Sequence, residues 1–374
     1  MHVLVTGAKG FIGRNLVVAL HRRGGIDVQE YDLDSAPESL EKGVASAEVI
    51  FHLAGVNRPQ KTEEFVQGNV DSTKHLCEVL RRLGRKPTLI YSSSTQAVLD
   101  NPYGQSKRKA EDIILTFGAG TAAKVAVFRL PGVFGKWCRP NYNSVVATFC
   151  HNVAHGLPLE IKDPAKELDL VHIDGVVAAF LGILNAQGRV GTDGYYLVEP
   201  VFKITLNRLA QMIQGFHASR KSLIVPDFSD HFARCLYSTY ISYLPTAQFS
   251  YPLEQREDAR GSLAEVLKSP NFGQIFVSRT RPGVMRGNHY HDTKVEKFAV
   301  LEGDAVIRFR HILGEDIIEY PVSGREFRVV DIPPGYTHSI ENIGQSDLIV
   351  LFWAYEELNP ADSDTYPLNV KKEK

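Results

Sequence analysis

The chain has little of several features that mark particular classes of protein. Its 374 residues include four cysteines, none of them in a C-x-x-C spacing, which argues against a disulfide framework and favours a reducing compartment. No apolar run reaches the roughly 20 residues that a membrane-spanning helix needs. The first residues, HVLVTG, lead directly into a glycine turn and lack the layout of a signal peptide. We expect a cytoplasmic protein that does not use a membrane as its partner.

The chain also lacks an excess of charge of either sign. Lys and Arg number 42, Asp and Glu number 43, and the formal net charge is -1. Without a strongly basic stretch, nucleic acid is not expected as a main partner. The hydrophobic fraction of 44% is sufficient for sizeable cores. Since the length exceeds what one hydrophobic core usually supports, we expect two domains.

The first half of the chain alternates short apolar runs with helical patterns. We expect strands at 2–7, 48–55, 87–94 and 124–130, helices near 12–23, 69–83 and 104–117, and later helices near 143–156 and 174–186 with a strand at 195–200. Alternation of this kind predicts an α/β fold with a doubly wound parallel sheet of the Rossmann type.

The pattern changes from about residue 250. Short strand-like runs recur, from GQIFVSRT to LIVLFW, and Gly, Pro and Asp turns separate them. Loss of helical periodicity predicts an all-β barrel or sandwich. The boundary falls within a stretch rich in Tyr and Pro, which predicts domains of residues 1–245 and 246–374.

A glycine pattern follows the first expected strand. Gly7, Gly10 and Gly13 form G-x-x-G-x-x-G at the start of a helix. Such a turn lets a pyrophosphate approach the backbone and the helix N-terminus, so it predicts dinucleotide binding. Asp32 ends the second expected strand and could bond the ribose hydroxyls of NAD or cap the loop that follows. No arginine follows it directly to hold a 2′-phosphate, which slightly favours NAD.

The sequence NPYGQSK contributes a possible acid–base pair. Tyr103 and Lys107 stand four residues apart, so a helix places them on one face. An adjacent ammonium group makes a tyrosine, with its usual pKa near ~10, a usable proton donor or acceptor. A serine hydroxyl from the end of the strand YSSS could polarise a carbonyl group. This combination predicts carbonyl reduction or a related proton transfer.

A second group of residues near the end of the chain has the spacing of metal ligands. His289 and His291 lie two apart, so on a strand they face the same side. Glu296 and His338 could complete a set of three imidazoles and one carboxylate. These ligands suit zinc or a divalent iron, manganese or nickel ion.

The first half resembles the extended short-chain dehydrogenase/reductase family in TGAKGFIG, FHLAG, GNV, YSSS, PYGQSK, FRLPGVFG and DLVHIDGV, spread over residues 3–177. The resemblance implies that Ser94, Tyr103 and Lys107 are catalytic, with Ser93 as the alternative serine. The implied cofactor-binding residues are Gly7, Gly10, Phe11, Ile12, Gly13, Asp32, Leu53, Ala54, Gly55, Tyr103 and Lys107. The implied substrate-binding residues are Asn69, Arg129, Arg139, Asn141 and Asn143.

The last third resembles the cupin family, a jelly-roll barrel. Its first motif is complete around GNHYHDTKVEKF, while the second has Phe327 where a glycine is usual, with Gly324 nearby. The resemblance implies that His289, His291, Glu296 and His338 bind a metal ion, most simply zinc. Whether the ion is structural or catalytic stays open.

Over nearly its full length the chain resembles the CapF-type family of bifunctional enzymes of capsular polysaccharide and O-antigen precursor synthesis. The resemblance implies a homodimer that makes a precursor of UDP-N-acetyl-L-fucosamine from a UDP-linked 4-keto-6-deoxy amino sugar. The cupin domain would epimerise carbon 3 of UDP-2-acetamido-2,6-dideoxy-4-keto-hexose, and the reductase domain would reduce carbon 4. It also implies NADPH, against the slight preference for NADH that Asp32 suggests.

The order of these two reactions follows from their chemistry. A carbonyl group acidifies the proton on the neighbouring carbon, so epimerisation needs only an acid and a base, and reduction then fixes the configuration. Lys294 is the proposed acid–base residue, with His311 and Tyr336 as alternatives. Two other interpretations stay open, in which the cupin is an iron oxygenase or a structural or binding module.

Overall fold

The computed structural model describes residues 1–357 and 363–371. The chain divides into two compact units: residues 1–214 with 234–245, here the Rossmann unit, and residues 215–233 with 246–374, here the barrel unit. The segment 215–233 lies in the barrel unit, although the sequence analysis assigned it to the first domain. Backbone pairing explains this, because Lys268 donates to the carbonyl of Leu223 and accepts from the amide of Val225 at 2.7 and 2.9 Å.

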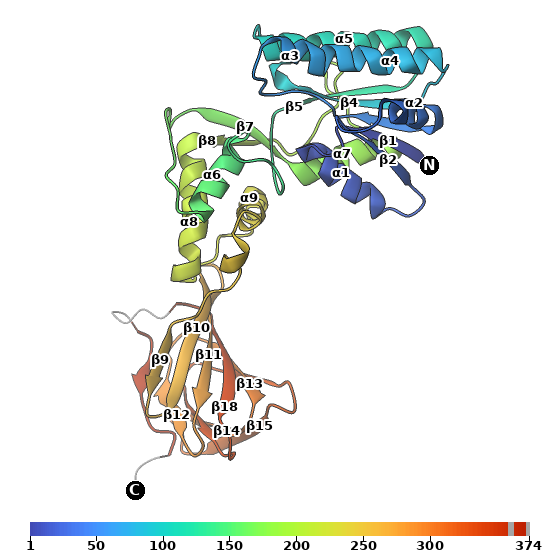
Figure 1. Cartoon of the computed structure of the whole chain (residues 1–374). Coiled ribbons are helices and arrows are strands. Elements are labelled where there is room, and N and C mark those ends of the chain that lie inside the picture. The colour runs from blue at the N-terminus through green and yellow to red at the C-terminus, as the bar shows by residue number, and fades with distance from the viewer. Residues whose placement is uncertain (358–362, 372–374) are drawn as a thin grey trace. The chain divides into compact units, whose positions relative to one another are not determined.

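A five-stranded parallel sheet forms the centre of the Rossmann unit (Figure 1). Its strands, in spatial order, are β2 (Asp27–Tyr31), β1 (His2–Thr6), β3 (Val49–His52), β4 (Thr88–Ser94) and β5 (Val125–Leu130). Every pairing is parallel. The predicted doubly wound Rossmann sheet is confirmed.

Helices cover both faces of this sheet. α1 (Phe11–His21) and α7 (Ile173–Leu184) share one buried apolar cluster with β1, β3 and β5. The second cluster, on the opposite face, contains side chains from α2 (Pro37–Ser46), α4 (Ser72–Arg82) and α5 (Pro102–Thr121). Neighbouring strand residues such as Leu4 and Val5 belong to different clusters, because side chains alternate across a strand. Short helical turns are α3 (Glu63–Phe65), η1 (Val66–Asp71) and η2 (Thr95–Val98).

The remainder of the Rossmann unit contains a small three-stranded sheet and further helices. The sheet is β6 (Gly132–Phe134), β7 (Glu167–His172) and β8 (Phe202–Thr205). The helices are α6 (Val145–Ala154), most of α8 (Leu206–Ser222) and α9 (His231–Ile241). The predicted strand at 195–200 is wrong, since this segment makes only isolated bridges at Tyr196. Gly194 turns the chain before it at φ 82, and Pro200 lacks the N–H that a ladder needs.

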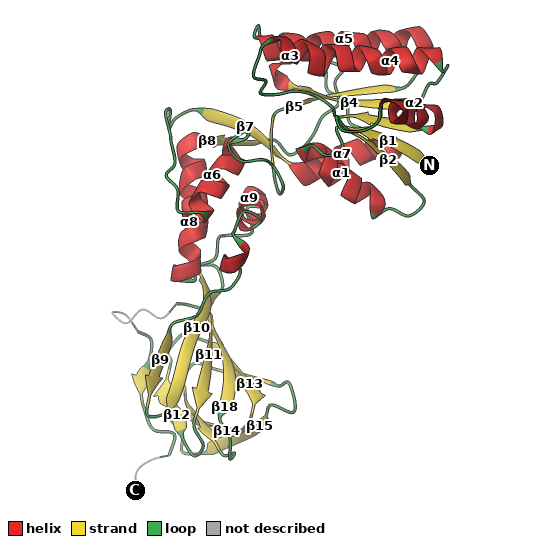
Figure 2. Ribbon diagram, in the orientation of Figure 1, coloured by secondary structure: helices red, strands yellow, loops and turns green. Residues whose placement is uncertain are grey.

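The barrel unit consists of two antiparallel sheets, drawn in yellow in Figure 2. The first is β16 (Val329–Ile332), β13 (Glu296–Glu302), β18 (Leu348–Ala354), β11 (Gly273–Thr280), β10 (Gly261–Ser269) and β9 (Gln255–Asp258). The second is β15 (Ile317–Ser323), β14 (Asp304–His311), β17 (Tyr336–Asn342), β12 (Met285–Tyr290) and β19 (Tyr366–Pro367). A short turn, η3 (Thr246–Gln248), precedes them.

One apolar core joins the two sheets of the barrel unit. Phe298 and Val350 of the first sheet pack with Ile307, Phe309 and Ile340 of the second. The predicted all-β second domain is confirmed.

In the turn before β16, Gly324 lies so close to the backbone of Glu302 that a Cβ on Gly324 would meet the Cα of Glu302 at 2.5 Å. Phe327 in the same turn is 91% exposed. Across the described residues no helix is both long and apolar enough to span a membrane.

Candidate functional site

The glycine turn between β1 and α1 can be built only from glycine at its first and third positions. Gly7 has φ +70, and a Cβ there would meet the backbone nitrogen of Ala54 at 2.7 Å. A Cβ on Gly13 would lie 2.1 Å from the carbonyl oxygen of Gly7. The chain therefore passes close to α1 without side chains between them, and the backbone amides at the helix N-terminus stay accessible to a phosphate.

A cavity of ≈810 Å³ opens beside this turn. Its wall includes most of the residues that the sequence analysis proposed for cofactor, catalysis and substrate: Gly7, Gly10, Phe11, Ile12, Gly13, Leu53, Gly55, Ser94, Tyr103, Lys107, Arg139 and Asn143. Of the predicted set, Ala54, Asp32, Asn69, Arg129 and Asn141 are not part of this wall as far as the described residues show. Its volume suits a ligand of nucleotide size.

Tyr103 and Lys107 enter the cavity from the first two turns of α5. Asn101 caps this helix, since its side-chain oxygen accepts from the amide of Gly104 at 2.8 Å. The Lys107 ammonium is buried, donates to the carbonyl of Ser92 at 2.7 Å and lies 4.5 Å from the Tyr91 ring centroid. Burial lowers the pKa of Lys107 to about 7, and the nearby Glu111 carboxylate opposes this shift.

Burial also sets the state of the tyrosine. It raises the pKa of Tyr103, and a hydrogen bond with Ser94 acts in the opposite direction. The sequence predicts an influence of the adjacent ammonium group on Tyr103, and in the folded chain desolvation is the largest influence on the pKa of this tyrosine. A tyrosine that keeps its proton at neutral pH is suited to donate that proton to a carbonyl oxygen.

Two neighbouring serines at the end of β4 have different partners. The Ser93 hydroxyl donates to the buried carboxylate of Glu111. The Ser94 hydroxyl accepts from the amide of Gln96 at 3.1 Å and has Tyr103 beside it. The hydroxyl of Ser94 can therefore also donate a hydrogen bond to a substrate, whereas that of Ser93 is already used by Glu111. This geometry favours Ser94 for the catalytic role.

Glu111 connects several residues behind the cavity, and the sequence analysis missed it. Its carboxylate accepts from Nη2 of Arg129 at 2.7 Å and from the Tyr195 hydroxyl at 3.2 Å. The Arg129 guanidinium also lies 3.7 Å from the Tyr195 ring centroid. Arg129, expected near substrate, is thus held by an ion pair outside the cavity wall. The signal was the position of Glu111, one turn beyond Lys107 on the same helix face.

Asn69 is a second residue whose side chain is used for support. It is buried, its oxygen accepts from the amide of Val56 at 2.9 Å, and its nitrogen donates to the Ser106 hydroxyl at 2.9 Å. These bonds tie η1 to α5 and to the loop after β3. The structure therefore places Asn69 behind the wall that carries Gly55 and Lys107.

Asp32 caps the loops at the end of β2. Its carboxylate accepts from the amide of Lys9 at 2.7 Å and from the amide of Leu33 at 2.8 Å. Of the two interpretations left open for Asp32, the structure shows the bonds of the loop-capping one, and each carboxylate oxygen can still accept a further hydrogen bond. The slight preference for NADH that this residue suggested stays a prediction.

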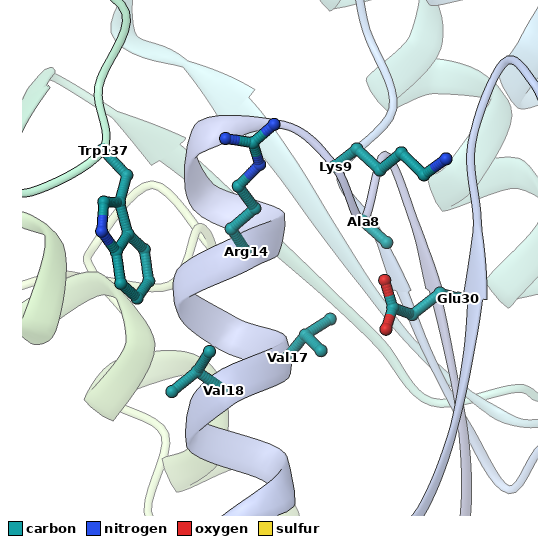
Figure 3. A pocket seen from close by; sticks show the side chains of 7 residues that line it. All are labelled: Ala8, Lys9, Arg14, Val17, Val18, Glu30 and Trp137. Atoms are coloured by element: carbon teal, nitrogen blue, oxygen red, sulfur yellow. The ribbon is translucent and has the colours of Figure 1, made fainter.

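A smaller groove of ≈370 Å³ lies next to the glycine turn, over the first two turns of α1 (Figure 3). Lys9 from the turn and Arg14 from the helix place two cationic groups along it, with Glu30 and Trp137 as further walls. Lys9 pairs with Asp34, and both side chains are exposed. Lys9, Arg14 and Trp137 also line the larger cavity, so the two spaces share part of their walls.

The predicted metal ligands converge within the barrel unit. His289, His291, Glu296 and His338 offer ligand atoms that all lie within 4.8 Å of one another. β12 and β17 bring them together, because His289 and His338 are paired across the two strands. Glu296 opens β13, and its Oε2 lies 3.4 Å from Nε2 of His291 and 3.6 Å from Nε2 of His338.

The chemistry of this group fits a divalent cation. Nε2 of His291 and both ring nitrogens of His338 are buried, and no described residue gives them a hydrogen-bond partner. Buried polar atoms are rarely left unpaired. Burial lowers the pKa of His338 to about 3, so its imidazole stays neutral, the form that binds metal. The set of three imidazoles and one carboxylate matches the donors that zinc and related ions prefer.

Of the three proposed acid–base residues, Lys294 has a side chain that contacts one of the ligands. Lys294 is buried, and its Nζ lies 3.9 Å from Oε1 of Glu296 and 3.3 Å from the Thr365 hydroxyl. The rings of His311 and Tyr336 pack edge to face at 5.0 Å. Tyr336 lines a separate cavity of ≈450 Å³ that also contains Phe309, the strand partner of His338.

A Rossmann sheet with a glycine turn and a Ser–Tyr–Lys group defines a nucleotide-dependent enzyme, here joined to a barrel with a metal-type ligand set. The chain belongs to the NAD dependent epimerase/dehydratase family, which matches residues 3–197. Residues 256–366 match the Polysaccharide biosynthesis C-terminal domain.

Several relatives match this chain over nearly its whole length. It is 45% identical over 370 residues to UDP-2-acetamido-2,6-beta-L-arabino-hexul-4-ose reductase of Pseudomonas aeruginosa, with 99% of each chain covered. The crystal structure of the capsular polysaccharide assembling protein CapF from Staphylococcus aureus is 43% identical, with a TM-score of 0.94 over 99% of this chain and 100% of that one. A structure of CapF with the inhibitor 3-isopropenyl-tropolone gives 38% identity and a TM-score of 0.89, with the same coverage. These findings confirm the predicted fold class, the resemblance to CapF-type enzymes and the expectation of an enzyme.

Proposed function

We propose that this chain is a bifunctional sugar-nucleotide enzyme of capsular polysaccharide precursor synthesis. The barrel unit epimerises carbon 3 of UDP-2-acetamido-2,6-dideoxy-4-keto-hexose, and the Rossmann unit then reduces the ketone at carbon 4. One observation carries this proposal. A chain that resembles a 4-keto sugar-nucleotide reductase over its full length also contains a second buried polar site, which hydride transfer does not require.

In the reduction, a bound nicotinamide would supply a hydride to carbon 4. Tyr103, kept protonated by burial, donates its phenolic proton to the oxygen of that carbonyl, so the ketone becomes a hydroxyl group. The Ser94 hydroxyl donates a hydrogen bond to the same oxygen and orients it. Lys107, one helical turn from Tyr103, would in its protonated form stabilise the phenolate that the proton transfer leaves behind. Arg139 and Asn143, on the cavity wall, are proposed to hold the nucleotide part.

In the epimerisation, the carbonyl at carbon 4 makes the proton on carbon 3 acidic. A divalent ion held by His289, His291, Glu296 and His338 would polarise that carbonyl. Lys294, buried beside Glu296, is proposed to return or remove the proton at carbon 3. No redox cofactor is consumed, because the proton that leaves one face is replaced on the other.

NADPH is the proposed reductant. Asp32, which would oppose a 2′-phosphate near the adenosine ribose, has its carboxylate bonded to the amides of Lys9 and Leu33. Lys9 and Arg14 lie along the groove next to the glycine turn (Figure 3), where cations favour a dianionic phosphate. Lys9 would exchange its exposed ion pair with Asp34 for a contact with that phosphate. The set of three imidazoles and one carboxylate supports zinc as the proposed ion, and a homodimer in the cytoplasm is proposed from the resemblance to the CapF-type family.

Solvent exchange at carbon 3 tests the two-site assignment directly. The purified full-length chain is incubated with the 4-keto sugar nucleotide in D₂O without a nicotinamide cofactor, and deuterium at carbon 3 is followed by NMR. We expect exchange in the wild type and in Tyr103→Phe, and loss of exchange in His289→Ala. With NADPH added, the rate of reduction by Tyr103→Phe should be at least about 100-fold lower than that of the wild type, while the variant still binds the cofactor.

Three results would contradict parts of the proposal. Absence of exchange in the wild type would leave a reductase whose barrel is a binding or structural module. Oxygen consumption that depends on iron would instead favour the oxygenase interpretation. Wild-type reduction by Tyr103→Phe would remove the basis for its catalytic role.

A further inference from the structure

The end of the chain returns to the metal-type cluster. Residues 363–371, here called the strap, contain β19, which pairs with β12 so that Pro367 lies opposite His289 and Tyr366 opposite Tyr290. The amide of Leu368 donates to the carbonyl of Asn288 at 2.9 Å. The Arg310 guanidinium, which is buried, donates to the carbonyls of Asn369 and Val370 at 2.8 Å each. The strap is therefore held along much of its length by β12 and β14.

Asp364 occupies the turn that joins two of the ligands. Its Oδ1 accepts from the amide of Asp292 at 2.8 Å. Its Oδ2 accepts from the amide and the hydroxyl of Thr293 at 2.8 and 2.9 Å, and from the amide of Lys294 at 2.7 Å. These three residues are the first of the four that separate His291 from Glu296. One carboxylate thus fixes the backbone over most of the interval that sets the spacing of these ligands.

The backbone of Asp364 also determines the state of His291. Its carbonyl oxygen bonds to Nδ1 of that imidazole. Since a carbonyl oxygen can only accept, Nδ1 must carry the proton in the neutral ring. The lone pair is then on Nε2, the buried nitrogen that faces the cluster without a hydrogen-bond partner among the described residues. The strap therefore selects the tautomer that a ligand needs and orients the ring.

The strap contacts Lys294 as well. Lys294 Nζ donates to the Thr365 hydroxyl at 3.3 Å, while its backbone amide donates to Asp364. Lys294, the proposed acid–base residue, and the ligand His291 are thus held by two consecutive residues of the strap, Asp364 and Thr365. Among the described residues, no other side chain accepts hydrogen bonds from all three successive backbone amides of residues 292–294.

We propose that Asp364 is the positioning residue of the metal site, and that metal retention depends on docking of the strap. The inference rests on the proposed metal site and deepens it, because it assigns a role to a residue outside the four ligands. Groups that orient ligands in this way typically account for about a 10- to 100-fold difference in metal affinity. Asp364→Asn places an amide NH₂ where one carboxylate oxygen now accepts, so a donor would face the backbone donors of the turn.

Metal binding by the full-length protein tests the inference. Apo protein is titrated with Zn²⁺ in competition with a chromophoric chelator, and a parallel sample is loaded with Co²⁺ for its absorption spectrum. We expect Asp364→Asn to weaken Zn²⁺ binding by about 10- to 100-fold and to change the Co²⁺ bands. Thr293→Val, which removes one of the four bonds, should have a smaller effect. Asp316→Asn, an exposed turn residue of the same unit, removes equal charge and should bind as the wild type does.

The outcomes distinguish failure of the proposed metal site from failure of the role proposed for Asp364. Weak Zn²⁺ binding by the wild type would contradict both the metal site and this inference. Tight binding by the wild type and equal binding by Asp364→Asn, with unchanged Co²⁺ bands, would contradict the inference alone. The thermal midpoints of the apo proteins show whether a variant has simply unfolded. If Asp364→Asn is unstable without metal, Asp364→Glu serves instead, since it keeps the charge but shifts the oxygens and should bind Zn²⁺ less tightly.

Discussion

Among the residues that line the cavity, Lys107 is one whose pKa the fold lowers strongly. Its ammonium group is buried and hydrogen-bonded to one backbone carbonyl, and burial lowers its pKa to about 7. An unfolded lysine has a pKa near 10.4. Between these two values the unfolded chain holds the proton and the folded chain does not. The position of this lysine therefore has a consequence for stability as well as for catalysis.

This difference predicts a pH-dependent effect of Lys107→Met. Below pH 7 the wild type keeps a buried charge, so the variant should unfold at a temperature higher by several degrees. As the pH rises from 7 towards 10, folding of the wild type no longer requires the charge to be buried, and the advantage of the variant should shrink. Calorimetry from pH 6 to 9.5 measures the difference between the two proteins. A difference that is constant across this range would show that folding leaves the pKa of the lysine unchanged, as expected for a solvated ammonium group.

Lys9 and Arg14 give a second prediction for single residues. If they bind the 2′-phosphate of NADPH, then Lys9→Gln and Arg14→Gln should each lower kcat/KM for NADPH by about tenfold, since a charge-assisted bond is worth about 1.5–3 kcal/mol. Values for NADH should stay nearly unchanged. Arg22→Gln, at the C-terminal end of α1, is the control for the loss of a positive charge. An equal loss with both cofactors would mean that these residues support the turn rather than read the phosphate.

Among the structural elements, α5 determines the geometry of the reductase site. The helix begins at Pro102 after the Asn101 cap and carries Tyr103 and Lys107 in its first two turns. Its start is packed tightly against η2, because a Cβ on Gly104 would lie 2.2 Å from the carbonyl oxygen of Gln96. The third residue of the helix therefore has no room for a side chain.

A pair of alanine substitutions in α5 tests this packing. Gly104→Ala should destabilise the Rossmann unit and displace Tyr103, with a loss of reductase activity that exceeds the loss of folded protein. Gly120→Ala is the matched control, because nothing lies within 4 Å of the added Cβ and alanine favours a helix by up to about 1 kcal/mol over glycine. We expect it to raise stability and leave activity unchanged. Denaturant unfolding and NADPH oxidation measure both effects, and full activity of Gly104→Ala would refute the positional argument.

For the whole molecule, the proposed function links two reactions by their chemistry. The ketone that acidifies carbon 3 is the group that the Rossmann unit removes. In D₂O with ordinary NADPH, the final product should therefore carry deuterium at carbon 3 and protium at carbon 4. NADPH deuterated at its transferable hydrogen, used in H₂O, should give the reverse pattern. NMR of the isolated product measures both labels, and protium at carbon 3 in the first experiment would show reduction without epimerisation.

Local sequence determined those features that depend on short-range geometry. A glycine turn, Tyr103 four residues before Lys107, and two histidines two apart all have their meaning within one turn or one strand, because helix and strand periods fix which side chains share a face. The doubly wound sheet and the change to an all-β unit followed from the alternation of apolar runs in the same way. The wrong strand at 195–200 had the right residue types, but the turn before it and Pro200 limit its pairing.

Only the tertiary structure decided the roles that depend on a partner distant in the chain. Asp32 is bonded to the amide of Lys9, 23 residues away. Arg129 pairs with Glu111 instead of lining the cavity, and Asp364 reaches the turn after His291 across more than 70 residues. A carboxylate or guanidinium looks the same in the sequence whether it meets a ligand or another side chain. Folding determines which partner comes within hydrogen-bonding distance, and that partner gives each of these residues its function.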